Sequence, residues 1–137
     1  TGAVFGGEHS GHYYFRDFWR ADSGMLAALH VLAAAAEATA PVSALLGSFE
    51  RYVASGEINS TVDDVPAVLA RVRESLAGRD GVVVDDLDGV TARHRDWTCN
   101  VRPSNTEPLV RLNAEAQDSA TLTALCHDVL TLIRSTA

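Results

Sequence analysis

A polar stretch bracketed by two prolines constrains the second half of the chain more than any other feature. It runs from Arg102 to Pro108 and contains a guanidinium group, two hydroxyls and an amide. Pro103 and Pro108 each fix their own φ and disfavour the helical conformation in the residue before them. We therefore expect a stiff loop that exposes side-chain donors and backbone N–H groups. The alternative is an ordinary polar turn between two strands, because Ser, Asn, Thr and Pro are common turn residues.

The chemistry of this stretch suits a phosphate group. An arginine presents a planar two-pronged fork to phosphate oxygens, and hydroxyl, amide and backbone N–H groups complete the oxygen shell. Each well-made charge-assisted hydrogen bond contributes about 1.5–3 kcal/mol. The candidate phosphate-binding residues are Arg102, Ser104, Asn105 and Thr106, with Arg111 just beyond the loop.

The apolar pattern on both sides of this stretch predicts an α+β domain. Apolar residues at helical spacing mark helices, and short apolar runs separated by turn residues mark strands. The order after residue 40 is helix, strand, helix, four strands and helix, which favours a mainly antiparallel sheet with helices packed on one face. The expected helices run from Pro41 to near Gly47, from an Asp63-Asp64 cap to Gly78, and onward from a Ser119 cap; the expected strands are 51–61, 82–84, 90–93, 97–101 and 109–116.

A long apolar helix is expected near the N-terminus. It runs from Met25 to Thr39 and follows two capping candidates, Asp22 and Ser23. The helix is apolar nearly all round, and such a helix is normally buried on more than one side. The chain offers few other residues to bury it, which indicates missing partner layers.

The N-terminal region is expected to be the last strand–loop–helix piece of an α/β domain. Short strands are predicted at 3–5 and 13–15, separated by glycines. The chain opens at Thr1 rather than at a methionine, so we expect a piece cut from a longer protein. We place a domain boundary at the Thr39-Ala40-Pro41 break. The two regions are then 1–39 and 40–137.

A second polar stretch lies among glycines between the two N-terminal strands. Glu8, Ser10 and His12 alternate along it and can point to one side of an extended loop. We expect Glu8 and Ser10 to bind sugar hydroxyls, because a carboxylate accepts from two adjacent hydroxyls and serine adds one more bond. His12 is expected to move a proton or to contact phosphate.

Two alternatives stand beside this interpretation of the glycine-rich stretch. One is a plain turn with solvated polar residues. The other is a metal site made of Glu8, His9 and His12, which is disfavoured because positions 9 and 12 fall on opposite sides of an extended chain. No metal ligand is therefore predicted in this chain.

Composition disfavours several classes of partner. The net charge is -7, and all 11 basic residues are arginines that form no basic run, which argues against a broad nucleic-acid surface. No apolar run reaches membrane-spanning length. The two cysteines, Cys99 and Cys126, are interpreted as reduced core residues of a cytoplasmic protein. We expect neither nucleic acid nor membrane as a partner.

The two polar stretches together resemble a known family. The run from Gly7 to His12 resembles the sugar-binding loop of the α-D-phosphohexomutases, and the run from Arg102 to Pro108 resembles the phosphate-binding loop of their fourth domain. The resemblance covers the whole chain as the end of domain three (1–39) and domain four (40–137). With Asn105, the loop resembles that of the phosphomannomutase/phosphoglucomutase branch, because phosphoglucosamine mutases usually carry glycine at this position.

The resemblance implies a four-domain enzyme that interconverts hexose 1-phosphate and hexose 6-phosphate. A phosphoserine in domain one donates the phosphate, a hexose 1,6-bisphosphate is the intermediate, and Mg²⁺ is the cofactor. It assigns sugar hydroxyls to Glu8 and Ser10, a proton-transfer or phosphate-contact role to His12, and the non-reacting phosphate to the loop residues Arg102, Ser104, Asn105 and Thr106. Arg111 is a weaker candidate.

The motifs for the nucleophile and for the Mg²⁺ ligands are absent from this chain. We therefore expect this piece to be inactive alone and to act with the N-terminal domains of the same polypeptide and a phosphosugar substrate. A phosphoglucosamine mutase fragment and a stand-alone phosphosugar-binding module stay open as alternatives. The sequence leaves the choice between mannose and glucose phosphate open.

Overall fold

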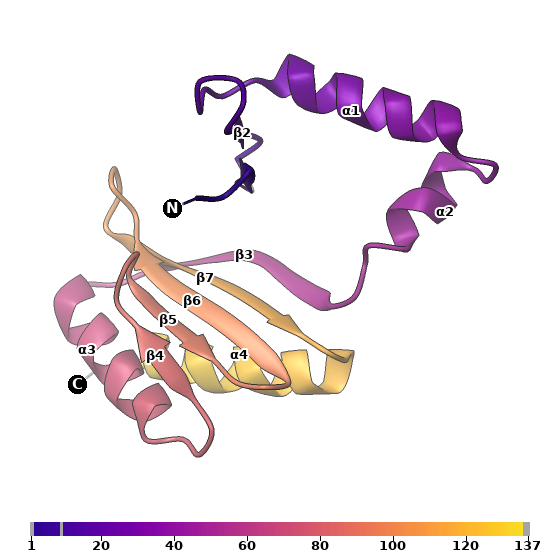
Figure 1. Cartoon of the computed structure of the whole chain (residues 1–137). Coiled ribbons are helices and arrows are strands. Elements are labelled where there is room, and N and C mark those ends of the chain that lie inside the picture. The colour runs from indigo at the N-terminus through magenta and orange to yellow at the C-terminus, as the bar shows by residue number, and fades with distance from the viewer. Residues whose placement is uncertain (1, 9, 136–137) are drawn as a thin grey trace. The chain divides into compact units, whose positions relative to one another are not determined.

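The chain divides into two units, the first ending at Glu50 and the second beginning at Arg51 (Figure 1). The computed structural model describes residues 2–8 and 10–135. The division lies after the short second helix, whereas the sequence placed a boundary before it, at Thr39-Ala40-Pro41. Each unit is described by itself.

The first unit begins with a small antiparallel hairpin. Strands β1 (Phe5–Gly7) and β2 (Tyr13–Phe15) pair so that Phe5 lies opposite Phe15 and Gly7 opposite Tyr13. The Phe5 and Phe15 rings lie 5.2 Å apart, which gives the hairpin an aromatic cluster. The first strand starts later than predicted, because pairing with β2 draws the glycines into the ladder. Glu8 and residues 10–12 of the polar stretch therefore lie in the hairpin loop.

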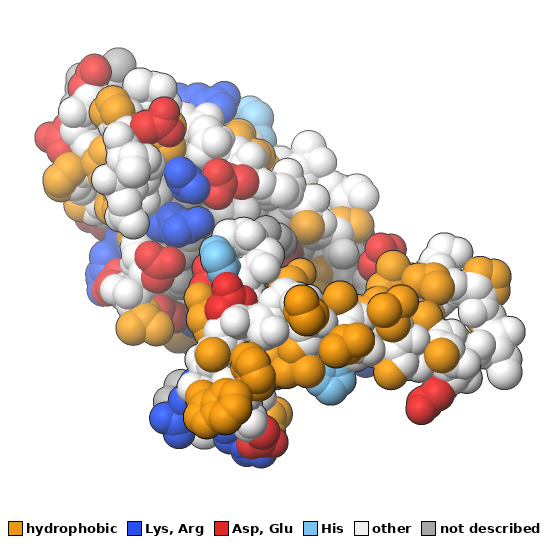
Figure 2. Space-filling view, turned by 90° about the horizontal axis from the view of Figure 1, so that it is seen from above, with side chains coloured by type: hydrophobic (Ala, Val, Ile, Leu, Met, Phe, Trp, Pro, Cys, Tyr) orange, Lys and Arg blue, Asp and Glu red, His pale blue; other side chains and the backbone are white. Residues whose placement is uncertain are grey.

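Two helices complete the first unit. Helix α1 (Gly24–Glu37) is capped by Ser23, whose hydroxyl accepts the Leu26 N–H at 3.1 Å, and helix α2 (Val42–Gly47) follows. Helix α1 ends two residues before the predicted Thr39, because Ala38 has an extended backbone. Among the described residues no α1 side chain is buried, and hydrophobic side chains gather along this helix in Figure 2.

The second unit is a five-stranded antiparallel sheet with two helices. The strand order is β3-β7-β6-β5-β4, and helices α3 and α4 pack on one face (Figure 1). This confirms the predicted α+β class and the predicted order of elements. The elements are β3 (Val53–Thr61), α3 (Val65–Ala77), β4 (Val83–Asp85), β5 (Val90–Arg93), β6 (Trp97–Pro103), β7 (Leu109–Ala116) and α4 (Ser119–Arg134).

Strict alternation along the central strands separates an apolar face from a polar one. On β7, residues 110, 112, 114 and 116 are buried and the intervening residues are not. The buried side packs against both helices, while the opposite side presents arginines, asparagines and acids. The core consists mainly of Val90, Ala92, Cys99, Val101, Val110, Leu112 and Ala114 from the strands, with Val68, Val72 and Leu76 from α3 and Leu125, Val129 and Ile133 from α4.

Each long helix of this unit begins at an aspartate. Asp64 accepts the Ala67 N–H at 2.9 Å at the start of α3. The predicted Ser119 cap of α4 is wrong by one residue: Asp118 accepts the Thr121 N–H at 2.8 Å, and Ser119 is already helical. Because the helix already begins at Ser119, Asp118 is the flanking residue whose carboxylate reaches a free N–H group of the first turn. That bond holds the pKa of Asp118 below its ordinary value.

Both cysteines are free thiols, as the sequence suggested. Cys99 is buried on the core side of β6, and burial raises the pKa of its thiol to about 12. Among the described residues no helix is long and apolar enough to cross a membrane.

Candidate functional site

The predicted phosphate loop joins β6, the middle strand of the sheet, to its neighbour β7. Strand β6 continues past the predicted end at 101, so that Arg102 pairs with Arg111 and Pro103 with Val110. The loop is closed at its base, because the Ser104 N–H donates to the Leu109 carbonyl at 2.9 Å. The packed sheet therefore fixes both ends of this β6–β7 loop.

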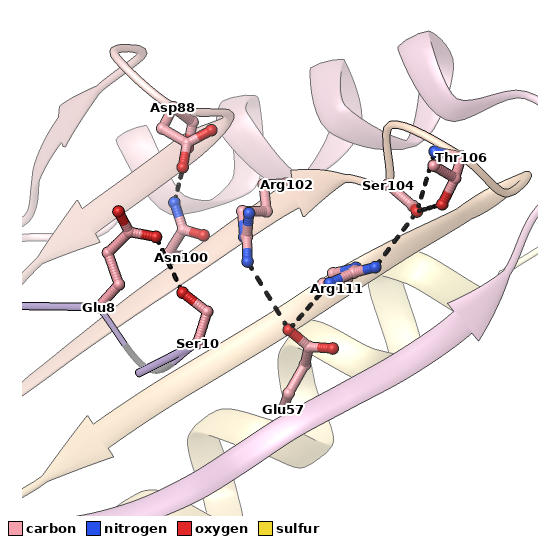
Figure 3. Close-up of polar contacts among 9 residues, drawn as sticks. All are labelled: Glu8, Ser10, Glu57, Asp88, Asn100, Arg102, Ser104, Thr106 and Arg111. Carbon is pink, nitrogen blue, oxygen red and sulfur yellow. Dashed lines mark hydrogen bonds and ion pairs between the residues drawn. The ribbon is translucent and has the colours of Figure 1, made fainter. Parts of the chain in front are cut away.

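Two arginines and one glutamate form a cluster at the foot of the loop. Arg102 and Arg111 lie side by side on neighbouring strands, on the sheet face opposite the helices (Figure 3). One oxygen of Glu57, from β3, lies 3.7 Å from Arg102 Nη2 and 3.4 Å from Arg111 Nη1. Like charges directly opposite one another in a sheet repel, and the carboxylate offsets that repulsion.

Arg111 also contacts the loop itself. Its Nη2 donates to Ser104 Oγ at 3.4 Å, and the same oxygen accepts the Thr106 N–H at 3.4 Å (Figure 3). The Nε of Arg111 is buried and has no hydrogen-bond partner among the described residues. The two hydrogen bonds to Ser104 Oγ are long and therefore weak. The side chains of Asn105 and Thr106 are exposed, so the loop has donors available for an anion.

A neighbouring turn supports the strand beneath Arg102. The side-chain amide of Asn100 donates to the Asp88 carbonyl at 2.7 Å and to Thr91 Oγ1 at 2.9 Å. Gly89 has φ 67°, and a Cβ there would lie 2.4 Å from the Val101 carbonyl oxygen and 2.7 Å from the Cα of Arg102. An Asp-Gly pair such as Asp88-Gly89 is a typical hairpin-turn signal, but sequence reasoning missed its close approach to β6 at the foot of the β6–β7 loop.

The predicted sugar-binding residues lie in the β1–β2 hairpin loop. Ser10 Oγ donates to Glu8 Oε2 at 3.0 Å (Figure 3), so the structure brings this pair together as expected. The Glu8 carboxylate raises the pKa of the Tyr14 phenol, chiefly through a hydrogen bond. Gly11, with φ 83°, permits the tight turn in which its N–H donates to the Glu8 carbonyl.

His12 is held by a residue that sequence reasoning assigned to another role. Asp22 was a capping candidate, yet its Oδ2 lies 2.6 Å from His12 Nδ1 and its Oδ1 accepts the Tyr13 N–H at 2.8 Å. The hydrogen bond and the charge of Asp22 raise the pKa of His12, and the same hydrogen bond lowers the pKa of Asp22. This pair favours a positively charged imidazole.

The described residues hold no group of three histidine, cysteine or acidic side chains placed to bind a metal ion. The disfavoured metal site of Glu8, His9 and His12 includes His9, which lies outside the described residues. Mg²⁺ was expected to bind residues outside this chain, and that expectation stays a prediction.

Comparison with known proteins identifies the family. Residues 57–132 match the family model described as phosphoglucomutase/phosphomannomutase, C-terminal domain. Residues 1–52 match the model described as phosphoglucomutase/phosphomannomutase, alpha/beta/alpha domain III. The chain belongs to the phosphoglucomutase/phosphomannomutase family. The predicted resemblance to the phosphohexomutases is thereby confirmed.

Individual relatives agree with this family assignment. A protein named "Phosphohexose mutases" from Xanthomonas campestris pv. campestris (strain B100) is 40% identical over 134 residues, which cover 96% of this chain and 30% of the relative. A phosphomannomutase from Salmonella montevideo is 41% identical over 139 residues, covering 97% of this chain and 29% of the relative.

A solved structure shows the same fold. The crystal structure of a phosphoglucomutase/phosphomannomutase family protein from Burkholderia thailandensis superposes with a TM-score of 0.78 at 30% identity. The match covers 100% of this chain and 30% of that one. The chain thus spans about 30% of the length of the family members that it matches.

Proposed function

We propose that this chain is the C-terminal part of a phosphomannomutase/phosphoglucomutase that interconverts hexose 1-phosphate and hexose 6-phosphate through a hexose 1,6-bisphosphate. The names of the relatives support a hexose phosphate as the substrate class. The nucleophile and the Mg²⁺ site belong to parts of the protein outside this chain, so the chain is inactive alone. Mg²⁺ would there stabilise the charge of the transferred phosphate. We also propose a cytoplasmic location.

The observation that carries this proposal is the arrangement at the β6–β7 loop. Arg102 and Arg111 lie opposite one another, and the hydroxyl of Ser104 and the exposed loop stand beside them. Such a set of donors holds the phosphate that is not reacting. The anchored phosphate orients the other end of the sugar for phosphate transfer, and orientation of this kind contributes strongly to rate.

The hairpin loop of the first unit has the complementary role. The paired Glu8 and Ser10 accept and donate hydrogen bonds to sugar hydroxyls. His12, with its pKa raised by Asp22, carries a proton that it can donate to a phosphate oxygen. We propose that these residues bind the hexose and favour an imidazolium contact with phosphate over proton abstraction.

Phosphate binding by the chain tests the proposal. Arg102→Ala should weaken the binding of inorganic phosphate about tenfold or more, because charge-assisted hydrogen bonds to one guanidinium are lost. The matched control is Arg93→Ala, an arginine on the same sheet face that is paired with Asp85. NMR titrations give both affinities. Equal affinity of the Arg102→Ala variant and the wild type would contradict the proposed site.

The same titrations extend to the sugar. Glucose 1-phosphate and mannose 1-phosphate should shift signals at residues 102–106 and also at residue 8 and residues 10–12. Shifts at the β6–β7 loop alone would contradict the sugar-binding role of the hairpin loop. In the full-length enzyme, Arg102→Ala should lower kcat/KM about tenfold or more.

A further inference from the structure

Glu57 occupies an unexpected place for an acidic residue. It lies on β3 directly after a β-bulge, with Asn113 as its register partner, and Arg111 is paired with Asn59 two residues on. Its side chain therefore reaches diagonally across the polar face of the sheet to the two arginines at the foot of the phosphate loop. An acid beside a phosphate site repels the ligand, so its presence requires a physical reason.

The ion pairs that Glu57 makes with the two arginines are weak enough for a phosphate to replace them. One carboxylate oxygen lies 3.4 Å and 3.7 Å from the two guanidinium groups, whereas strong charge-assisted bonds lie at about 2.7–2.9 Å. The side chain of Glu57 is 36% exposed, so solvent screens both ion pairs. The buried Nε of Arg111 also lacks a partner among the described residues. A phosphate, with more oxygens and more charge, would satisfy these donors better.

We propose that Glu57 competes with bound phosphate for Arg102 and Arg111 and thereby limits phosphate affinity. The inference rests on the proposed function of the β6–β7 loop. Glu57 reduces the charge of the three-residue cluster from two positive units to one, and it keeps both guanidinium groups in place when no ligand is bound. Phosphate displaces the carboxylate on binding, and the carboxylate re-forms its ion pairs when phosphate leaves.

This competition has a clear use in a reaction that passes through a bisphosphate intermediate. The intermediate must leave the site in one orientation and return in the other. A site that holds every phosphate equally tightly slows that exchange without speeding the chemical step. Glu57 therefore acts as a positioning residue that favours release.

The charge-removing variant Glu57→Gln tests the sign of the effect. If Glu57 competes, Glu57→Gln should bind inorganic phosphate about two- to tenfold more tightly, the range expected for two half-exposed ion pairs. If the Glu57 carboxylate served only to preorganise the two arginines, Glu57→Gln should instead bind phosphate more weakly. Glutamine has the same size, so the sheet should fold as before, and circular dichroism checks this.

Glu115→Gln is the matched control. Glu115 lies on the same face of β7, four residues and about 13 Å along the strand from Arg111, and is not paired with an arginine among the described residues. Glu115→Gln changes the net charge by the same amount as Glu57→Gln but leaves the cluster of Glu57, Arg102 and Arg111 intact. Tighter binding by Glu57→Gln than by Glu115→Gln supports competition, while equal or weaker binding overturns it.

Displacement of Glu57 by phosphate can also be tested directly on the wild-type chain by NMR. Saturation with inorganic phosphate should shift the side-chain carboxyl ¹³C signal of Glu57 and leave that of Glu115 in place. An unshifted Glu57 signal at saturation overturns the inference. If Arg102→Ala binds phosphate as the wild type does, the proposed function itself fails. If Arg102→Ala weakens binding but Glu57→Gln matches its control, only the inference about Glu57 fails.

Discussion

The two polar loops of this chain are held in different ways. The β6–β7 loop joins two inner strands of a sheet whose other face packs against α3 and α4. The β1–β2 loop belongs to a unit in which no residue of its strands or helices is buried, and its main polar ties are Glu8 with Ser10 and His12 with Asp22. Packing within the chain thus fixes the β6–β7 loop, the proposed phosphate loop, whereas side-chain hydrogen bonds fix the β1–β2 loop, the proposed sugar loop.

Truncation of one leucine in each unit should show this contrast most strongly. Leu112 is fully buried on the core side of β7, so Leu112→Ala should lower the free energy of unfolding of the second unit by about 2–5 kcal/mol. Leu32 on α1 is 64% exposed, and Leu32→Ala should change the stability of the first unit little. Urea unfolding followed by the amide NMR signals of each unit separates the two effects.

A similar loss in the free energy of unfolding of both units would contradict this contrast. It would mean that α1 has buried contacts in solution, for example in a second copy of the chain. Repeating the Leu32→Ala measurement at several protein concentrations identifies that case, since stability gained through association depends on concentration.

Alanine at two glycines sharpens the comparison within the second unit. Gly56 and Gly89 both have positive φ, but a Cβ at Gly56 meets nothing within 4 Å while one at Gly89 meets the backbone at Arg102. Gly56→Ala should lower the free energy of unfolding by about 1–2 kcal/mol, because only the positive φ is unfavourable there. Gly89→Ala should cost about 1–3 kcal/mol more, because the neighbouring strand must move.

Phosphate affinity gives this pair a second readout. Gly89→Ala should also weaken phosphate binding, since the displaced strand carries Arg102, whereas Gly56→Ala should leave that strand in place and act on the site only through Glu57, its neighbour at the β-bulge. Chemical denaturation and phosphate titration measure the two quantities. Equal stability of the two variants would contradict the close approach of the turn to the strand.

The sequence predicted the second unit well because its signals are local. Apolar runs, helical spacing of apolar residues and the Asp63-Asp64 cap each involve residues a few positions apart. The predicted class and order of elements follow from them, with errors of a residue or two at the ends. Ser119 was wrong as a cap because Asp118 and Ser119 are both good capping residues and only the helix start decides between them.

The site was predicted in part, and the missing residues have a common feature. Glu57, Asn100 and Asp22 act on residues that lie at least nine positions away in the sequence. Which of them meet depends on strand register and on a β-bulge, neither of which leaves a clear mark in the composition of a single strand. Loop motifs thus identify the residues that face a ligand, while the residues that hold them require the fold.

The smallest expected effect concerns the sugar loop and its dependence on pH. Asp22 raises the pKa of His12, and His12 in turn lowers the pKa of Asp22. Since the folded-state pKa of His12 is raised, its contribution to the order of the loop is complete below the ordinary histidine pKa and is lost as pH rises through the raised value. The contribution of Asp22 is present above its ordinary pKa and is lost as pH falls through the lowered value.

Asp22→Asn should therefore lower the pKa of His12, which ¹H–¹⁵N NMR of the imidazole measures directly. The matched control is Asp17→Asn, which removes an acidic group of the same unit that is paired with Arg16. A pKa of His12 that is equal in both variants would show that the ion pair with Asp22 does not hold the imidazole. The sugar loop would then depend on contacts other than this pair, and the contrast with the phosphate loop would lose its physical basis.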